Sequence, residues 1–197
     1  MFSYRLNDHA ELRLPELHHA DEIYAIVDKN RAYLRPWMGW VNESHGPDDI
    51  KKWINKSYEQ LARDDGFQTC IFYDGRYVGG CGFVYMHGPS RRCEIGYWID
   101  EEHQRHGLVT MAARALIEYA IDKRNFNRVE IRCDPRNVRS AAVAQRLGFK
   151  LDGVLRENTI ISGQIVDMAV WSLLAAEWKI ARAERTQITD PRAELDR

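Results

Sequence analysis

Long apolar runs are missing from this sequence, and their absence excludes proteins built on membrane-spanning helices. The longest uncharged apolar-rich stretch is MAVWSLLAA at residues 168–176, far short of the roughly 20 residues that such a helix needs. Near the start of the chain, Arg5, Asp8 and Glu11 stand where a secretory signal would be apolar. We therefore expect a cytoplasmic protein without a membrane partner.

An excess of charge of one sign is missing as well. The chain has 28 Lys and Arg residues and 29 Asp and Glu residues, which gives a formal net charge of −1. Such a chain has no overall field that would attract nucleic acid, and the sequence shows no basic stripe or stacking platform. A nucleic-acid-binding module is therefore the least favoured class, and we expect no direct nucleic-acid partner.

Metal and thiol motifs are also lacking. The cysteines form no CxxC pair and lie in apolar, strand-like segments, which predicts small buried side chains in a reducing compartment. His103 and His106 are three residues apart, but no second pair with zinc spacing accompanies them. The sequence therefore predicts no metal. The four cysteines are Cys70, Cys81, Cys93 and Cys133.

What the sequence does contain is enough apolar material for one folded domain. Its 197 residues are 45% hydrophobic and 11% aromatic, as in globular proteins. Hydrophobic periodicity and turn residues predict the order β-α-α-β-β-β-α-β-α-β-β. A helix between two of the strands implies a parallel crossover, so we expect a mixed α/β fold. The expected strands cover residues 10–17, 67–73, 76–86, 92–99, 127–133, 151–161 and 164–174, and the expected helices cover residues 19–31, 48–63, 107–123 and 137–147.

Two segments fall outside these elements. Residues 33–41, YLRPWMGWV, contain Pro, Gly and two tryptophans, which predicts a loop with anchoring aromatics. Its rings either pack the loop onto the sheet or shape one side of a cleft. We expect one domain over residues 1–178, followed by a charged extension over residues 179–197 that is frayed or disordered.

The turn EEHQRHGLVT, residues 101–110, leads from an expected strand into a helix through a single glycine, Gly107. The first turn of a helix presents unpaired N–H groups and the positive end of the dipole, which suits a phosphate. Gly107 permits a positive φ, and Arg105 and His106 add positive charge. On this turn alone, a phosphate site and an ordinary strand-to-helix connection are equally good interpretations.

A second helix start favours the phosphate site. The stretch NVRSAAVAQRLGF, residues 137–149, places Asn137 at the expected N-cap and Gly148 at the left-handed position after the helix. Two parallel strands would therefore each feed a helix, and both helices would open on the same edge of the sheet. Ligand clefts of α/β sheets form at such carboxyl ends.

These residues resemble the acetyl-CoA-binding core of the GNAT N-acetyltransferases, and the element order is similar to that superfamily over residues 10–178. Within it, NRAYLRPWMGWV, GYWID and ISGQIVDMAVWSLLAAEW look most like the RimL-type ribosomal-protein serine acetyltransferases. The resemblance implies a GNAT-like single domain and acetyl-CoA as co-substrate. Val109, where many relatives keep a small residue, fits the RimL-type subfamily.

The resemblance also implies where acetyl-CoA binds. Backbone groups of Tyr97, Trp98 and Ile99 would pair with the pantetheine arm, as an added strand pairs with a sheet edge. Asn137 would contact the cofactor arm and Ser140 would lie near the sulfur. The pyrophosphate would be held by the turn that comprises Gln104, Arg105, His106, Gly107, Leu108, Val109 and Thr110.

The general base and the general acid of similar enzymes have no direct counterparts in this sequence. Ribosomal-protein alanine acetyltransferases place a Glu and a Tyr at the positions that are Arg132 and Ala144 here, and the RimL base position is similar to Thr159, two residues from Glu157.

The chemistry of acetyl transfer needs a neutral amine, a polarised carbonyl and a protonated leaving thiolate. Ser140, in the first turn of a helix, is our candidate donor to the thiolate, and an ordinary polar first-turn residue is the alternative. Glu94 shares a strand face with Gly96 and Trp98 and is our candidate base, with a structural carboxylate as the alternative. Asp167 and Glu157 are weaker candidates.

We therefore predict an acetyl-CoA-dependent N-acetyltransferase that acts on a primary amine. The first acceptor class is the N-terminus of a protein, such as a ribosomal protein. A small amine, for example a polyamine, an antibiotic or an aminoacyl nucleotide, is the second acceptor class. A CoA-binding sensor without catalysis is the rival from another class. The sequence leaves the oligomeric state open, including a homodimer.

Overall fold

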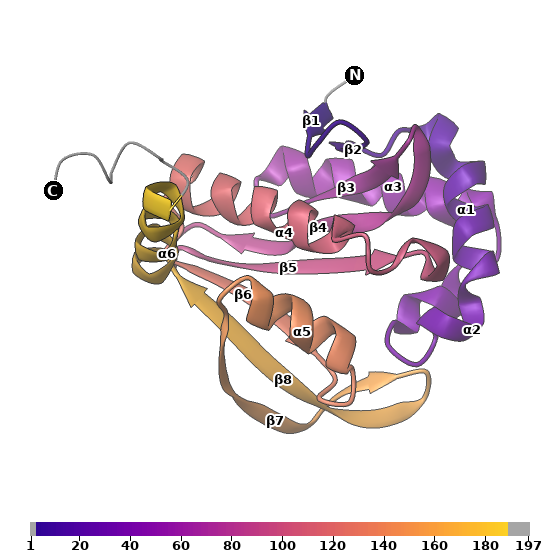
Figure 1. Cartoon of the computed structure of the whole chain (residues 1–197). Coiled ribbons are helices and arrows are strands. Elements are labelled where there is room, and N and C mark those ends of the chain that lie inside the picture. Colours follow the sequence, from indigo (N-terminus) through magenta and orange to yellow (C-terminus); the bar gives the residue numbers. More distant parts are fainter. Residues whose placement is uncertain (1–2, 189–197) are drawn as a thin grey trace, which may run out of the picture.

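The computed structural model describes residues 3–188, and these build one eight-stranded sheet in the order β1-β2-β3-β4-β5-β6-β8-β7 (Figure 1). Neighbouring strands are antiparallel except β5 and β6, which are parallel as predicted. The mixed α/β fold class is confirmed. The strands are β1 (Ser3–Arg5), β2 (Ala10–Arg13), β3 (Phe67–Tyr73), β4 (Arg76–His87), β5 (Arg92–Ile99), β6 (Arg128–Cys133), β7 (Lys150–Ile161) and β8 (Gln164–Leu174).

Helices cover both faces of the sheet (Figure 1). Helices α1 and α3 pack over β3 and β4 around one buried apolar cluster, and α4 and α5 belong to a second cluster on the opposite face. None of the described helices has the length and apolarity that crossing a membrane requires. The helices are α1 (Ala20–Lys29), α2 (Arg31–Leu34), α3 (Pro47–Arg63), α4 (Leu108–Glu118), α5 (Val138–Arg146) and α6 (Ala175–Ile188).

Strand β5 divides its side chains between the two clusters by simple alternation. Cys93, Ile95 and Ile99 are buried on the α4 side, and Tyr97 packs against the same cluster. Trp98 points to the α1 and α3 side, where its ring centroid lies 5.9 Å from that of Tyr77. The period-two pattern thus fixes which residues of β5 reach each face.

The parallel ladder between β5 and β6 is short. It pairs Arg92 with Arg128, Cys93 with Val129 and Glu94 with Glu130, and it ends there. Strand β6 stays paired with β8 as far as Cys133, whereas β5 continues to Ile99 without a strand on this side. The two strands therefore part towards their carboxyl ends (Figure 1).

Two elements end earlier in the structure than the sequence predicts. The expected strand over residues 10–17 stops at Arg13, because Pro15 offers no N–H to a ladder and a 3₁₀ turn, Leu17–His19, follows. The helix expected over residues 107–123 is an α-helix only to Glu118, and Tyr119–Lys123 form a π-helical turn. Strand β1 was not expected.

The prediction of a frayed extension is wrong for residues 179–188, which continue helix α6. The indole of Trp178 is buried in the core that α4 covers and anchors this helix, and Arg182 forms an ion pair with Asp122 in the turn after α4. Residues 189–197 lie outside the described residues. The domain boundary at residue 178 stays a prediction.

Candidate functional site

The opening between β5 and β6 gathers the residues that the sequence singled out. Backbone groups of β5 that point towards β6 beyond Glu94 have no strand partner, so this edge can accept an extended ligand arm. The start of α4 lies beyond the end of β5, and the start of α5 lies beyond the end of β6. Both helices thus open beside the gap, as predicted.

The start of α4 has the backbone geometry of an anion site. Gly107 has a φ of 73° and Arg105 a φ of 67°, so the turn alternates through left-handed conformations that point N–H groups to one side. The first bond of the helix runs from the Met111 N–H to the Gly107 carbonyl at 3.0 Å. The N–H groups of Leu108, Val109 and Thr110 therefore have no acceptor within the helix.

One side chain of this turn supports a ligand there. The Nε2 atom of Gln104 is buried and has no hydrogen-bond partner among the described residues. A buried donor without an acceptor costs free energy unless a bound group supplies one. Together with the open N–H groups of α4, it fits a pyrophosphate. The His106 ring is tilted against the Tyr73 ring, with 5.5 Å between the ring centroids.

A buried carboxylate that sequence reasoning missed holds this turn in place. Asp100, fully buried directly after β5, accepts hydrogen bonds from Asn30 Nδ2 at 2.7 Å and Lys29 Nζ at 3.4 Å and contacts His103 Nδ1 at 2.6 Å. The Glu101 N–H in turn donates to Asn30 Oδ1 at 2.9 Å. Burial raises the pKa of Asp100, but these hydrogen bonds outweigh it and leave the pKa below its usual value.

Across the gap, α5 begins as the sequence predicts. Asn137 is its N-cap, and the Asn137 Oδ1 accepts a hydrogen bond from the Ser140 N–H at 3.1 Å. The helix ends in a left-handed Gly148, whose successor Phe149 donates its N–H to the Ala144 carbonyl at 3.0 Å. These caps fix the orientation of Ser140 in the first turn.

A second hydroxyl joins Ser140, and the sequence interpretation missed it. The Tyr97 hydroxyl donates to the Ser140 carbonyl at 3.1 Å and lies 3.1 Å from the Ser140 Oγ, so it connects β5 to α5 across the gap. Burial raises the pKa of Tyr97 well above its ordinary value, which keeps the phenol protonated at neutral pH. The predicted role of Tyr97 involved only its backbone.

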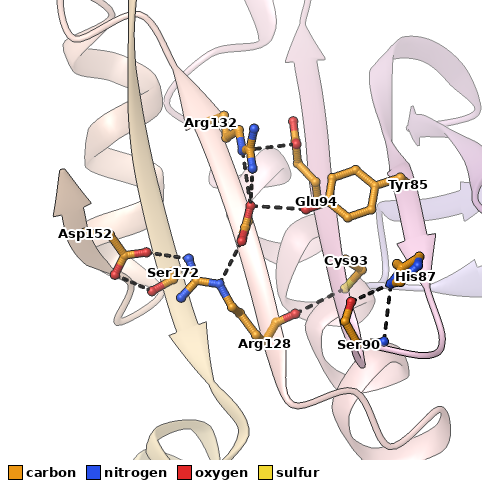
Figure 2. A network of polar contacts seen from close by, with 10 residues as sticks. Tyr85, His87, Ser90, Cys93, Glu94, Arg128, Arg132, Asp152 and Ser172 are labelled. Carbon is orange, nitrogen blue, oxygen red and sulfur yellow. Dashed lines mark hydrogen bonds and ion pairs between the residues drawn. The ribbon is translucent and has the colours of Figure 1, made fainter. Parts of the chain in front are cut away.

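At the closed end of the gap, Glu94 belongs to a network of charges (Figure 2). Its Oε2 lies 3.4 Å from the Nε of Arg132. Arg132 also donates at 2.8 Å to Glu130, which is buried and accepts further hydrogen bonds from Arg128 Nε at 2.7 Å and the Tyr85 hydroxyl at 3.2 Å. Two carboxylates therefore share the single guanidinium of Arg132.

The two carboxylates of this network titrate differently. Burial raises the pKa of Glu94, Glu130 raises it further, and Arg132 opposes both without cancelling them. Burial acts on Glu130 as well, but hydrogen bonds from Arg128 and Arg132 outweigh it and lower its pKa. Burial and Glu130 raise the pKa of Tyr85 to about 12. Glu94 is thus the carboxylate in this network with the greater affinity for a proton.

The remaining candidates lie elsewhere. Asp167 accepts a hydrogen bond from the Glu157 N–H at 2.8 Å on the β7–β8 hairpin, away from the ladder that holds Glu94. The loop predicted over residues 33–41 is in part helical, because α2 runs to Leu34 and a 3₁₀ helix begins at Gly39. In that 3₁₀ helix the ring centroid of Trp40 lies 6.0 Å from that of Trp98 on β5. Within residues 3–188, no group of three or more His, Cys, Asp or Glu side chains is placed to hold a metal ion.

Fold and site together define a class. A mixed sheet whose two parallel strands part, with the start of a helix beside the end of each strand, fits an acyltransferase that takes its acyl group from a CoA thioester. The sequence profile of the acetyltransferase (GNAT) domain matches residues 9–150. The chain belongs to this family of N-acetyltransferases.

Individual relatives agree with this assignment. The putative ribosomal N-acetyltransferase YdaF of Bacillus subtilis (strain 168) is 31% identical over 183 residues, 91% of this chain and 98% of that protein. The ribosomal-protein-serine acetyltransferase of Escherichia coli (strain K12) is 26% identical, over 85% of this chain and 94% of its own. Their names favour catalysis over a CoA-binding sensor.

Among solved structures, the microcin C7 self-immunity acetyltransferase MccE, in complex with acetyl-CoA and AMP, is similar with a TM-score of 0.83 and 28% identity. The match covers 86% of this chain and 94% of that one. A fold similar to that of this chain thus occurs in a protein whose structure was solved in complex with acetyl-CoA.

Replacing Gly107 by Glu tests the anion site. The carboxylate would stand against the pyrophosphate at the positive end of α4, and the Kd for acetyl-CoA measured by calorimetry should rise by about 100-fold or more. Gly107→Asn is the matched control, because Asn tolerates a positive φ and nothing lies within 4 Å of its Cβ position. Unchanged affinity of the Glu variant would contradict the assignment.

Proposed function

We propose that this N-acetyltransferase transfers the acetyl group of acetyl-CoA to the α-amine at the N-terminus of a protein, with a ribosomal protein as the first candidate. The observation that carries the proposal is the gap between β5 and β6, which has Glu94 at its closed end and the Ser140–Tyr97 pair across its open end. The names of the relatives support the acceptor class.

The residues of the gap bind and orient acetyl-CoA, which supplies the acetyl thioester when bound. Those backbone groups of Tyr97, Trp98 and Ile99 that face away from β4 hold the pantetheine arm as a strand would. The turn from Gln104 through Thr110 holds the pyrophosphate by its N–H groups, and Asn137 contacts the arm from the start of α5. These contacts fix the thioester between the two carboxyl ends of the strands.

Glu94 receives the proton of the incoming amine, directly or through one water. A carboxylate with a raised pKa is a better base than an exposed one, and burial beside Glu130 provides this shift. Arg132 opposes part of this rise in the pKa of Glu94. An N-terminal α-amine has a pKa near 8 and needs only modest help.

Ser140 donates a hydrogen bond to the departing sulfur. Its Oγ lies 3.1 Å from the Tyr97 hydroxyl, so Ser140 donates to the thiolate while it accepts from Tyr97, whose proton turns from the Ser140 carbonyl to the Ser140 Oγ. Tyr97 comes from β5, whereas the acid position known from the alanine acetyltransferases is Ala144 in this chain. The second hydroxyl thus compensates for the apolar residue on α5.

Acceptors are the direct test of the proposed function. CoA release, followed with a thiol reagent, should be fast with peptides that have a free N-terminal Ser or Ala and absent with the same peptides blocked at the N-terminus. Polyamines and amino sugars form the second arm, because MccE, a structural relative, was crystallised with AMP and makes a small-molecule acceptor the second candidate. Faster turnover of those amines than of any peptide would overturn the proposed acceptor.

Removing the hydroxyl of Ser140 should lower kcat by at least about tenfold, because the leaving thiolate loses a donor. The Kd for acetyl-CoA should change little, since the arm and the pyrophosphate are held elsewhere. Tyr97→Phe should have a smaller effect of the same kind, and the double variant should fall below either one. A kcat of Ser140→Ala equal to wild type would remove its proposed role.

The pH profile of kcat tests the base. Activity requires ionised Glu94 and is lost as the pH falls through its pKa. Glu94→Gln should lower kcat by about 10²-fold or more. Arg132→Gln removes a cation that lowers the pKa of Glu94, so the acid limb should move to higher pH. The assay should use a weakly basic acceptor amine, because such an amine is already neutral over the pH range in which Glu94 titrates. An acid limb that Arg132→Gln leaves in place would contradict the assignment of Glu94.

A further inference from the structure

A cavity of about 370 Å³ lies on the side of the molecule where the acceptor would enter. Three segments far apart in the sequence form its walls: the turn after α2, the loop after β6 and the tip of the β7–β8 hairpin. Figure 1 shows this hairpin reaching towards α2. Arg35 and Trp37 come from the first segment, Arg136 from the second, and Ile161, Ser162 and Val166 from the third.

The hydroxyl of Ser162 holds two of these walls together. It donates to the Arg35 carbonyl at 2.7 Å and accepts a hydrogen bond from Asn42 Nδ2 at 2.9 Å. Ser162 and Gly163 both have positive φ, as a tight hairpin turn requires. The hairpin tip is therefore hydrogen-bonded to the segment opposite it, and these bonds fix the position of two walls of the cavity.

The charged groups of the cavity are all of one sign. Arg35 and Arg136 line it, and no acidic side chain does so among the described residues. The Arg136 guanidinium donates to the buried carboxylate of Asp134, through Nε at 3.0 Å and through Nη2 at 2.5 Å, which neutralises much of its charge. Arg35 forms no ion pair with any residue in the range 3–188. Its guanidinium is the cation that the cavity leaves uncompensated.

The cavity is adjacent to the proposed acyl-transfer centre. Arg136 directly precedes Asn137, the N-cap of α5, and that helix carries Ser140 in its first turn. A chain in extended conformation advances about 3.3–3.6 Å per residue. The guanidinium carbon of Arg139, next to Ser140, lies 5.9 Å from the ring centroid of Tyr33 on α2, so the start of α5 lies against the segment that leads to Arg35. An acceptor with its amine at Ser140 would therefore bring the side chains of its next few residues near Arg35.

We propose that this cavity receives the first residues of the acceptor and selects a carboxylate side chain there, so that the acceptor is a protein with an acidic residue close to its N-terminus. The planar guanidinium of Arg35 suits a carboxylate, which it can bind through two parallel hydrogen bonds. Trp37 provides the apolar surface beside it. This inference rests on the proposed function and specifies its substrate.

Three peptides that differ only at residues two to four test the inference, with Glu, Gln or Lys at those positions behind a common N-terminal Ser. The wild-type kcat/KM should be highest for the Glu peptide, by about tenfold over the Gln peptide, and lowest for the Lys peptide. Arg35→Glu should invert this order, and Arg35→Gln should remove it. Lys179→Gln, on α6, changes the net charge by as much as Arg35→Gln does and should leave the order unchanged.

The outcomes separate the two levels of the proposal. Equal kcat/KM for the three peptides, or an order that Arg35→Glu leaves in place, would overturn the inference alone. Turnover of none of them would overturn the proposed function and this inference with it. Faster acetylation of a small anionic amine, such as O-phosphoserine amide, than of the Glu peptide would overturn the assignment to a protein. Acetyl-CoA affinity of each variant, measured in parallel, confirms that its donor site is intact.

Discussion

The rest of the structure depends on the point at which the β5–β6 ladder ends. Three paired rungs hold the strands together, and beyond Glu94 and Glu130 the backbone of β5 is left with unused hydrogen-bonding groups. In a closed sheet those groups would be satisfied by β6, and no ligand arm would fit. The same divergence separates the starts of α4 and α5, so that the two helix N-termini stand on opposite sides of a gap.

The last residue pair of the β5–β6 ladder also explains the charged network at the closed end of the gap. Glu94 and Glu130 are directly opposite each other on neighbouring strands, an arrangement that repels unless a cation lies between them. Arg132, two residues along β6, provides that cation, and Arg128 assists from the other side (Figure 2). Burial of Glu94, which Arg132 offsets only in part, is what makes this carboxylate hold a proton more readily than an exposed one does.

The local sequence pattern was enough to predict much of the fold, but it could not predict which residues far apart in the chain come into contact. The bounds of the strands at residues 67–73 and 92–99 and the caps Asn137 and Gly148 follow from neighbours in the chain, and the structure agrees with them. The contacts of Asp100 with Asn30, of Tyr97 with Ser140 and of Ser162 with Arg35 join residues 43 to 127 positions apart. No periodicity contains that information, because it arises from sheet order and from the lengths of the loops. The cofactor and catalytic roles assigned to residues from Glu94 to Ser140 stay predictions.

The buried Asp100 has a mechanical consequence. Its partners Lys29 and Asn30 stand at the junction of α1 and α2, from which the chain runs on to Arg35 and Trp37 in the acceptor wall, while its own backbone leads into the turn before α4. Hydrogen bonds at Asp100 and Glu101 therefore tie the segment that leads to the proposed acceptor cavity to the turn proposed to hold the donor. Both proposed substrate sites thus depend on the same buried contact.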